Sequence, residues 1–137
     1  MERKKMNSYD FKNQVAVVTG GANGIGFSVA ERLSKSGASV KIWDLDIEAA
    51  QTAAETINAE AVECDITDWI SVQNATETSI NASEKIDILV NSAGIAGPND
   101  TVVDYDNKAW DRIISVNLTG TYYVNKAVVP HMKANGY

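Results

Sequence analysis

The sequence predicts an α/β fold in which a parallel sheet is covered by helices on both faces. Two observations predict it. Four short runs of apolar, strand-forming residues are separated by three longer segments whose apolar residues recur at helical spacing. The first run also passes directly into a glycine-rich turn and a helical pattern, VAVVTGGANGIG at 15–26. Strands that alternate with helices in this way form right-handed βαβ units, which build a parallel sheet.

The first strand and helix lie within residues 15–37. The strand, Val15–Thr19, is apolar on both faces, as is typical of a strand inside a parallel sheet. Gly37 is placed to end the helix that follows. The apolar stripe of that helix is predicted to be formed by Ile25, Val29, Ala30 and Leu33.

The second unit begins with a strand in which Val40 and Ile42 alternate with Ser39 and Lys41, and it closes at Trp43 and Asp44. Asp46 can cap the helix that follows. Alanines at positions 49, 50, 53 and 54, together with Ile57, offer that helix a small-residue face for close packing on a sheet.

The third strand is short, Ala61–Cys64, and the fourth, Ile86–Val90, is the most apolar segment of the chain. Thr67 or Asp68 can cap the helix between these strands. Its inner stripe is predicted to be Trp69, Val72, Thr76 and Ile80.

A long helical pattern over 107–133 follows a connection at 91–105 that contains Gly94, Gly97 and Pro98. Pro130 lies near the end of this helix, which it can bend or stop. The apolar positions cover more than one stripe, which predicts burial along more than one side of the helix. They are Trp110, Ile113, Ile114, Val116, Leu118, Tyr122, Val124, Ala127 and Val128.

Composition excludes several classes of protein. The 137 residues are 45% hydrophobic, enough for one modest core, and the net charge of -6 argues against a nucleic-acid partner. No apolar run approaches the length that spans a membrane, and the N-terminus lacks the apolar stretch of a secretory signal. A single cysteine, Cys64, allows no internal disulfide and suits a cytoplasmic location. No metal site is predicted.

The glycine-rich turn is a candidate phosphate site. The first N–H groups of a helix have no partner within it and carry a partial positive charge, so they can bind a phosphate without a basic side chain. Gly20 can adopt backbone angles that other residues avoid, Gly24 leaves room for a pyrophosphate, and Gly26 lets the helix lie close to the strand. A glycine-rich loop with no ligand is the alternative.

Asp44 closes the second strand, 20 positions after Gly24, where a dinucleotide fold keeps the carboxylate that binds the adenosine ribose. Such a carboxylate repels a 2′-phosphate, and neither Asn23 nor Leu45 supplies a cation to bind one. NAD is therefore favoured over NADP. The alternative is that Asp44 caps a helix, but Asp46 is better placed for that and leaves Asp44 free.

Four motifs at the ends of successive predicted strands together resemble the short-chain dehydrogenase/reductases of the single-domain type: TGGANGIG at 19–26, Asp44, the pair Asp65–Ile66, and NSAG at 91–94. The resemblance implies a Rossmann-type doubly wound parallel sheet in three α/β/α layers, incomplete here with about four strands and four helices. We expect an N-terminal extension over residues 1–12 and an NAD-binding domain over 13–137.

The resemblance also implies roles for residues that match the family motifs. Asp65 would accept a hydrogen bond from the adenine amino group, with the Ile66 backbone beside the ring; a helix-capping or turn carboxylate is the alternative for Asp65. Asn117, in SVNLTG, would help to hold a water in the proton relay, and it is the only catalytic candidate; a packing or kink asparagine is the alternative. The remaining cofactor-binding candidates are Gly20, Asn23, Gly24, Ile25, Gly26, Leu45, Asn91, Ala93 and Gly94, with Ser92 replacing the second asparagine of the family's NNAG motif.

The family's catalytic serine, tyrosine and lysine have no counterpart in this sequence. Tyr122 and Lys126 have the family's tyrosine-to-lysine spacing, but they follow Asn117 on the same helix with no intervening strand, so we do not assign them a catalytic role. His131 is a residue favoured by the dipole at a helix end. We therefore expect the chain to be the cofactor-binding half of a longer enzyme, cut before its catalytic segment at Tyr137.

The implied function is that of an NAD-dependent oxidoreductase, which transfers a hydride between nicotinamide and a small alcohol or ketone. A 3-oxoacyl or sugar-derived substrate is compatible with this. The alternative is a non-catalytic dinucleotide-binding or dimerisation module. The resemblance further implies a homo-oligomer, a dimer or tetramer, formed through the long helix at 107–133, and the strand at 86–90 would leave an open apolar edge.

Overall fold

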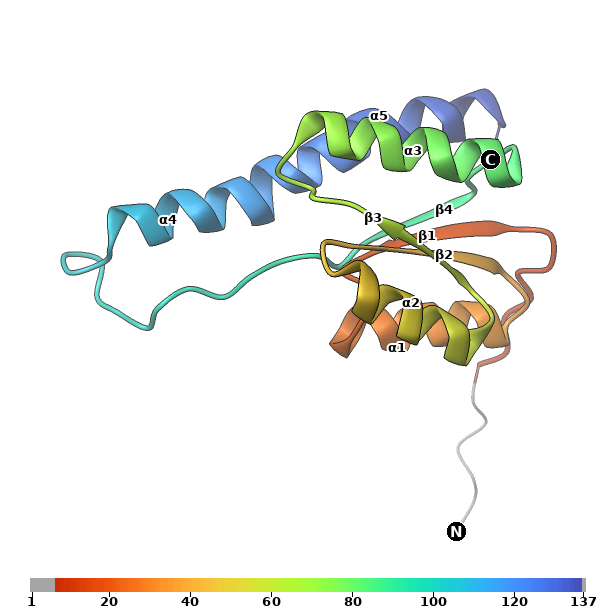
Figure 1. Cartoon of the computed structure of the whole chain (residues 1–137), viewed down its shortest axis with the longest axis horizontal. Coiled ribbons are helices and arrows are strands. Elements are labelled where there is room, and N and C mark those ends of the chain that lie inside the picture. The colour runs from red at the N-terminus through yellow and green to blue at the C-terminus, as the bar shows by residue number, and fades with distance from the viewer. Residues whose placement is uncertain (1–6, 137) are drawn as a thin grey trace, which may run out of the picture.

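The computed structural model describes residues 7–136, and within this range four parallel strands form one sheet in the order β3-β2-β1-β4 (Figure 1). The register pairs Val17 of β1 with Lys41 of β2 and with Leu89 of β4. The strands are β1 (Val15–Thr19), β2 (Ser39–Asp44), β3 (Glu60–Glu63) and β4 (Ile88–Asn91).

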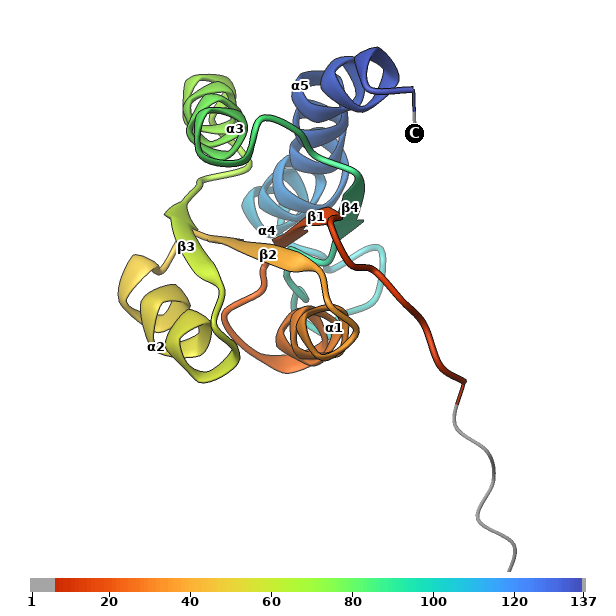
Figure 2. The same ribbon diagram turned by 90° about the vertical axis from the view of Figure 1, so that its right-hand side faces the viewer.

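Helices cover both faces of this sheet, which confirms the predicted three-layer arrangement. Figure 2 shows α1 and α2 on one side of the strands and α3 and α5 on the other. Their bounds are α1 (Gly24–Lys35), α2 (Ile47–Ile57), α3 (Trp69–Ser83) and α5 (Thr121–Ala134). In the part of the chain that the structure describes, no helix is both long and apolar enough to cross a membrane.

Alternation along β1 and β2 divides the core into two clusters, one under each helical layer. Ala16 and Val18 pack with Val40, Ile42 and the buried faces of α1 and α2. Successive residues of a strand point to opposite faces, so every second residue belongs to the other cluster, on the side of α3 and α5. Val17 and Trp43 are its members from these two strands.

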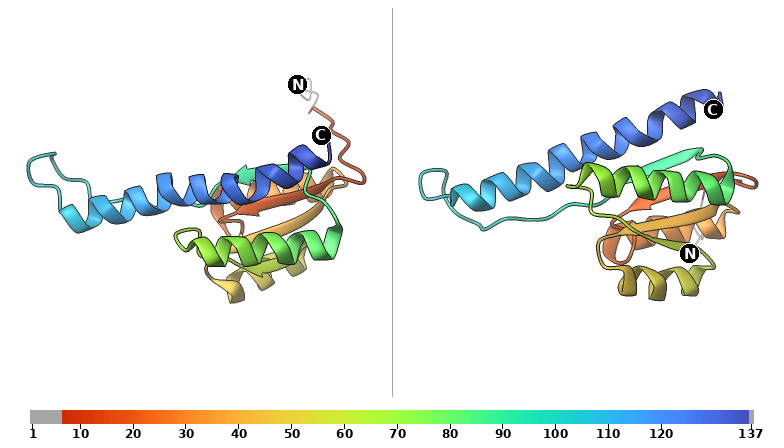
Figure 3. Two further views of the ribbon diagram at one scale, coloured as in Figure 1. Left: turned by 90° about the horizontal axis from the view of Figure 1, so that it is seen from above. Right: turned by 45° about the horizontal axis from the view of Figure 1, so that its top comes forward.

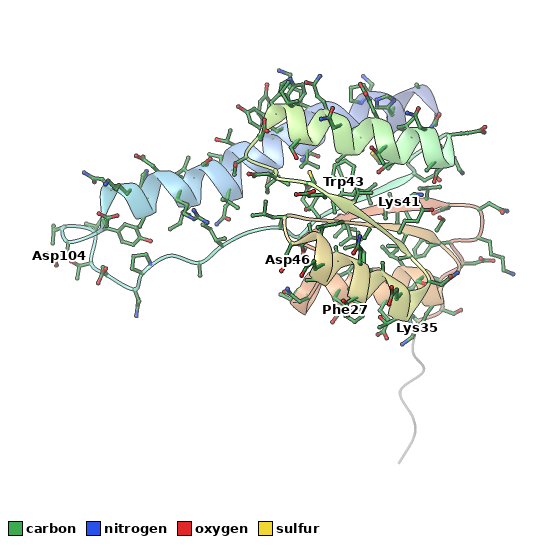
Figure 4. The ribbon with its side chains drawn as sticks, in the orientation of Figure 1. Phe27, Lys35, Lys41, Trp43, Asp46 and Asp104 are labelled. Atoms are coloured by element: carbon green, nitrogen blue, oxygen red, sulfur yellow. The ribbon has the colours of Figure 1, made fainter. Side chains whose placement is uncertain are left out.

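Two polar groups are buried on the second face. Figure 4 labels Trp43 and Lys41 on β2. The Trp43 Nε1 donates a hydrogen bond to Ser79 Oγ of α3 at 3.0 Å. The Lys41 ammonium is fully buried and lies 2.6 Å from a carboxylate oxygen of Glu60 on β3. Because a buried charge requires a partner, this ion pair joins β2 to β3 at their paired residues.

The predicted helix caps and strand boundaries are close to those observed. Asp46 accepts a hydrogen bond from Ala49 N, and Asp68 caps α3 in the same way through Ile70 N. The fourth strand begins two residues later than predicted, at Ile88. Asp87 precedes the strand and bonds Val15 twice: its carboxylate accepts the Val15 N–H at 2.8 Å, and its own backbone N–H donates to Val15 O at 2.8 Å, which ties the strand entrance to β1.

The long helix is continuous over residues 107–134 but has three parts: α4 (Asn107–Ile113), the π-helical segment η1 (Ile114–Gly120) and α5. Pro130 lies inside α5 and does not stop it. The prediction of burial along more than one side is wrong, since no residue of α4 is buried and α5 buries only Val124 and Val128, which lie on one face. For α4 the reason is visible in Figures 1 and 3, where this helix projects beyond the ends of the strands and has no strand beneath it.

Candidate functional site

A cleft of about 420 Å³ lies at the carboxyl ends of the strands, where a doubly wound sheet binds its ligands. The structure places most of the residues predicted from sequence in its wall. These are Gly20, Asn23, Gly24, Ile25, Gly26, Asp44, Leu45, Asp65, Ile66, Ala93 and Gly94. Asn91 and Asn117 do not line it.

The three glycines of the turn meet different requirements. Gly20 has a φ of +61°, and a Cβ at this position would lie 2.7 Å from the Cα of Ala93. A Cβ on Gly26 would overlap the carbonyl oxygen of Gly20, so this glycine lets α1 lie against the turn. Gly24 has a φ of +58° and no atom within 4 Å of its Cβ position, which leaves open space at the start of α1.

The N-terminus of α1 has no side-chain cap, whereas three other helices are each capped by the aspartate that precedes them. Asp46, Asp68 and Asp106 cap α2, α3 and α4. Asn23 makes no such hydrogen bond, and the first turn of α1 holds no acidic residue. The helix N–H groups and the positive end of its dipole therefore face the cleft, an arrangement that fits a phosphate group. Ile25, predicted to lie on the apolar stripe, is instead 82% exposed at this opening.

Asp44 is held at the mouth of the cleft by the backbone. Its Oδ2 accepts from Ala22 N and its Oδ1 from Asp46 N, both at 3.1 Å. Asp46 caps α2 as predicted, but Asp44 is not free, because it links the glycine turn to the end of β2. Each carboxylate oxygen can accept more than one hydrogen bond, so Asp44 retains capacity to bind a hydroxyl group.

Asp65 closes a turn and lines the cleft at the same time. Its Oδ1 accepts from Thr67 N at 2.9 Å and from Thr67 Oγ1 at 2.7 Å, which is the turn geometry considered as an alternative. Cys64, beside it, is buried. Burial, and next the negative charge of Asp65, raise the pKa of the Cys64 thiol to about 12. The thiol is therefore neutral at physiological pH.

Thr19 organises the loop after β4, and sequence reasoning missed it as a site residue. Its Oγ1 accepts from Ser92 N at 3.1 Å and from Ala93 N at 3.2 Å. These bonds place the NSAG backbone against the glycine turn. The available signal was a hydroxyl residue at the end of an apolar strand, since a buried hydroxyl requires hydrogen-bond partners.

Asn117 lies in η1 and binds the same loop at Ile95, just after the NSAG residues. Its Oδ1 accepts from Ile95 N at 2.8 Å, and its Nδ2 donates to Ile95 O at 2.9 Å. The side-chain amide thus pairs with one residue of the loop as a neighbouring strand would. This is the packing role considered as an alternative for Asn117.

Tyr122 and Lys126 lie away from the cleft. They line a separate hollow on α5 together with Asn125, Val129, Pro130 and Lys133. The Lys126 ammonium lies 5.5 Å from the centre of the Tyr122 ring and 5.1 Å from that of Trp69, so its neighbours there are aromatic faces.

Seven residues of the cleft wall were not predicted. Trp43, Cys64, Thr67, Ser92 and Ile95 are each adjacent in sequence to a predicted residue, so adjacency is the signal that could have found them. Arg112 and Val116 are different, because they come from α4 and η1. No local pattern places these two residues beside the glycine turn.

Comparison with known proteins identifies the family. The family model described as short chain dehydrogenase matches residues 14–137. A 2-dehydro-3-deoxy-L-rhamnonate dehydrogenase (NAD(+)) of Sphingomonas sp. (strain SKA58) is 41% identical over 128 residues, which cover 93% of this chain and 51% of that protein. A probable NADP-dependent mannitol dehydrogenase of Yarrowia lipolytica is 33% identical and is matched over 50% of its length. The chain spans about half the length of the curated relatives it matches.

The structural comparison agrees. A crystal structure of 3-ketoacyl-(acyl-carrier-protein) reductase from Brucella melitensis complexed with NADH superposes with a TM-score of 0.90 at 36% identity, covering 93% of this chain and 53% of that one. The sequence match and the fold therefore agree over the same residues. The chain belongs to the short chain dehydrogenase family.

Proposed function

We propose that this chain supplies the dinucleotide-binding part, residues 13–137 after a short extension, of an NAD-dependent oxidoreductase. Bound NAD would supply the hydride acceptor or donor. The observation that carries the proposal is the position of Asp44, an anionic side chain fixed by two backbone N–H groups at the edge of the cleft.

Asp44 supports NAD rather than NADP on electrostatic grounds. A ribose diol donates hydrogen bonds to a carboxylate, whereas a 2′-phosphate is repelled by it and requires a cation instead. Neither Asn23 nor Leu45, its neighbours in the cleft wall, is basic. One relative is named as an NAD(+) enzyme and another as NADP-dependent, so the preference is argued from this site alone.

The other predicted residues take roles along the same ligand. The pyrophosphate would lie at the uncapped start of α1, formed by Gly20, Asn23, Gly24, Ile25 and Gly26. Asp65 and Ile66 would contact the adenine, and Asn91, Ala93 and Gly94 would close around the other ribose. Asn117, whose side chain pairs with Ile95, would help to hold a water in the proton relay.

We propose a small alcohol or ketone as substrate, of the 3-oxoacyl or sugar-derived type. The support is that a solved relative is named as a 3-ketoacyl reductase and a curated relative as a deoxyrhamnonate dehydrogenase. We further propose a homo-oligomer, in which the helix at 107–133 forms the contact, and a cytoplasmic location. The single cysteine supports the latter, since it leaves no disulfide to form within the chain.

Calorimetric titration of the 137-residue chain with NAD and NADP tests the cofactor assignment. Asp44→Ala should weaken NAD binding about tenfold, because it removes a hydrogen bond to a charged acceptor. The preference, measured as the ratio of the dissociation constants for NADP and NAD, should fall by at least the same factor. Asp46→Ala is the matched control: it removes the same charge two residues away and should leave the ratio unchanged.

If Asp44→Ala left the ratio of the affinities for NAD and NADP unchanged, the assignment of Asp44 as the residue that selects NAD would be contradicted. The same chain, incubated with NAD and alcohols or with NADH and ketones, should bind the cofactor without hydride transfer, which the absorbance of the reduced nicotinamide measures. The reason is that no tyrosine or lysine lines the cleft in the part of the chain that the structure describes.

A further inference from the structure

Arg112 is the one lysine or arginine in the wall of the cleft, across residues 7–136. It belongs to α4, and its side chain is exposed. No described residue forms a hydrogen bond or an ion pair with its guanidinium group. The cleft wall also carries Asp44 and Asp65, and the whole chain has a net charge of -6. A single unpaired cation in an acidic cleft is available to a ligand.

Contacts on either side of the helix show which way Arg112 faces. Ile113 meets Gly97, and Asn117, four residues later, bonds Ile95, so this row of the helix faces the loop after β4. A second row contains Gly120, whose Cβ position lies 2.8 Å from the Ile66 side chain after β3. Residues four apart lie near one another on the same face of the helix in both its α and π parts, since four residues are slightly more than one α-helical turn and slightly less than one π-helical turn.

Val116 and Arg112 precede Gly120 by four and eight residues and therefore continue this second row. Val116 packs against the core cluster that contains Ile66. Arg112 is about one turn earlier, in α4, the part of the helix that projects beyond the sheet (Figure 1). The guanidinium thus lies over the cleft on the side of Ile66, beyond the packed part of the helix.

The order of the strands gives the direction of a bound dinucleotide. The uncapped start of α1 follows β1, Asp44 ends β2, and Ile66 follows β3, which is at the edge of the sheet. With phosphates at α1 and the adenosine ribose at Asp44, the next group along the ligand, the base, reaches the end of β3. This step rests on the proposed function.

We propose that Arg112 is a specificity-determining residue that packs its guanidinium plane on the adenine ring and covers it from the α4 side. A guanidinium group is planar, weakly hydrated and attracted to the face of a π-system. Nucleobases stack on arginine planes in other proteins. Val116, which also lines the cleft, provides an apolar contact for the same ring.

Titration of the full 137-residue chain with NAD, with NADP and with AMP tests this. Arg112→Ala should weaken binding of all three by the same factor, roughly threefold to tenfold, because all three carry the adenine. Arg112→Lys keeps the charge but not the plane and should restore little of the loss. Lys108→Ala, one turn earlier on α4 and outside the cleft, removes an equal charge and should bind as the unaltered chain does.

Three results would overturn the proposal. Arg112→Ala binding AMP as tightly as the unaltered chain would remove the adenine contact. Full restoration by Arg112→Lys, or a loss confined to NADP, would indicate a point charge that serves a phosphate. If the unaltered chain bound no NAD, the proposed function itself would fall, and this inference with it. Thermal unfolding should be equal for all variants, since truncation of Arg112 breaks no hydrogen bond or ion pair among the described residues.

Discussion

Gly26 shows how one atom decides the geometry of the turn. Its backbone is helical, so a left-handed angle is not the reason for glycine here. The reason is contact, because an added Cβ would overlap the Gly20 carbonyl oxygen. Backbone cannot rotate away as a flexible side chain can. Gly24 is the opposite case, with a positive φ and open space around it.

We therefore predict different effects for alanine at these two positions. Gly26→Ala should lower the free energy of unfolding by about 3 kcal/mol, through overpacking against rigid backbone. Gly24→Ala should lower it by about 1 kcal/mol, through the left-handed backbone alone. Urea unfolding monitored by circular dichroism measures both. Equal stability of the two variants would refute the contact argument.

Among the residues of the site, those that act through local spacing could be predicted from the sequence. Asp44 and Asp46 were assigned correctly to a strand end and a helix cap because caps and turns depend on the next three residues. Arg112 could not be predicted. Arg112 lies more than 60 residues after Asp44 in the chain, and its place in the cleft depends on where its helix lies relative to the strand ends. No short sequence pattern encodes that position.

At the scale of elements, η1 joins two strand ends. Asn117 holds the loop after β4 through Ile95, and Gly120 lies against Ile66 after β3. In this segment the backbone hydrogen bonds join residues i and i+5, as in a π-helix, so each turn contains more residues than an α-helical turn. A sequence search for 3.6-residue periodicity does not predict that segment, and its contacts with Ile95 and Ile66 are tertiary.

Asn117→Ala should therefore release the loop. It removes both hydrogen bonds to Ile95, and we expect the free energy of unfolding to fall by about 1–2 kcal/mol. Hydrogen exchange at the Ile95 amide should accelerate more than at amides of β1. Asn125→Ala is the control, because it deletes an amide from the same helix that bonds only Thr121 O within that helix. An unchanged exchange rate at the Ile95 amide would show that the Asn117 side chain does not hold this loop in place.

At the scale of the whole molecule, the two faces of the sheet followed from the sequence because alternation along a strand is local. Lys41 and Trp43 had to share a face opposite Val40 and Ile42, and they do. The exposure of α4 did not follow. Its apolar residues have helical spacing, but the connection before it carries the helix past the ends of the strands (Figure 3). Periodicity predicts an apolar face and does not predict what covers it.

Exposed apolar residues further along the helix, in η1 and α5, are the basis for a last prediction. Leu118 and Tyr122 are 64% and 56% exposed, and Val129, further along the same helix, is exposed too. An apolar row of this kind on one helix is typical of a contact surface, and we expect two copies of the chain to pair along it. Leu118→Glu should raise the dissociation constant of that pair at least about tenfold, because it places a charge in an apolar contact. Ile70→Glu, at a similarly exposed position on α3, should leave it unchanged. Light scattering over a concentration series decides: a monomer at every concentration, or equal association of Leu118→Glu and the unaltered chain, would rule this surface out.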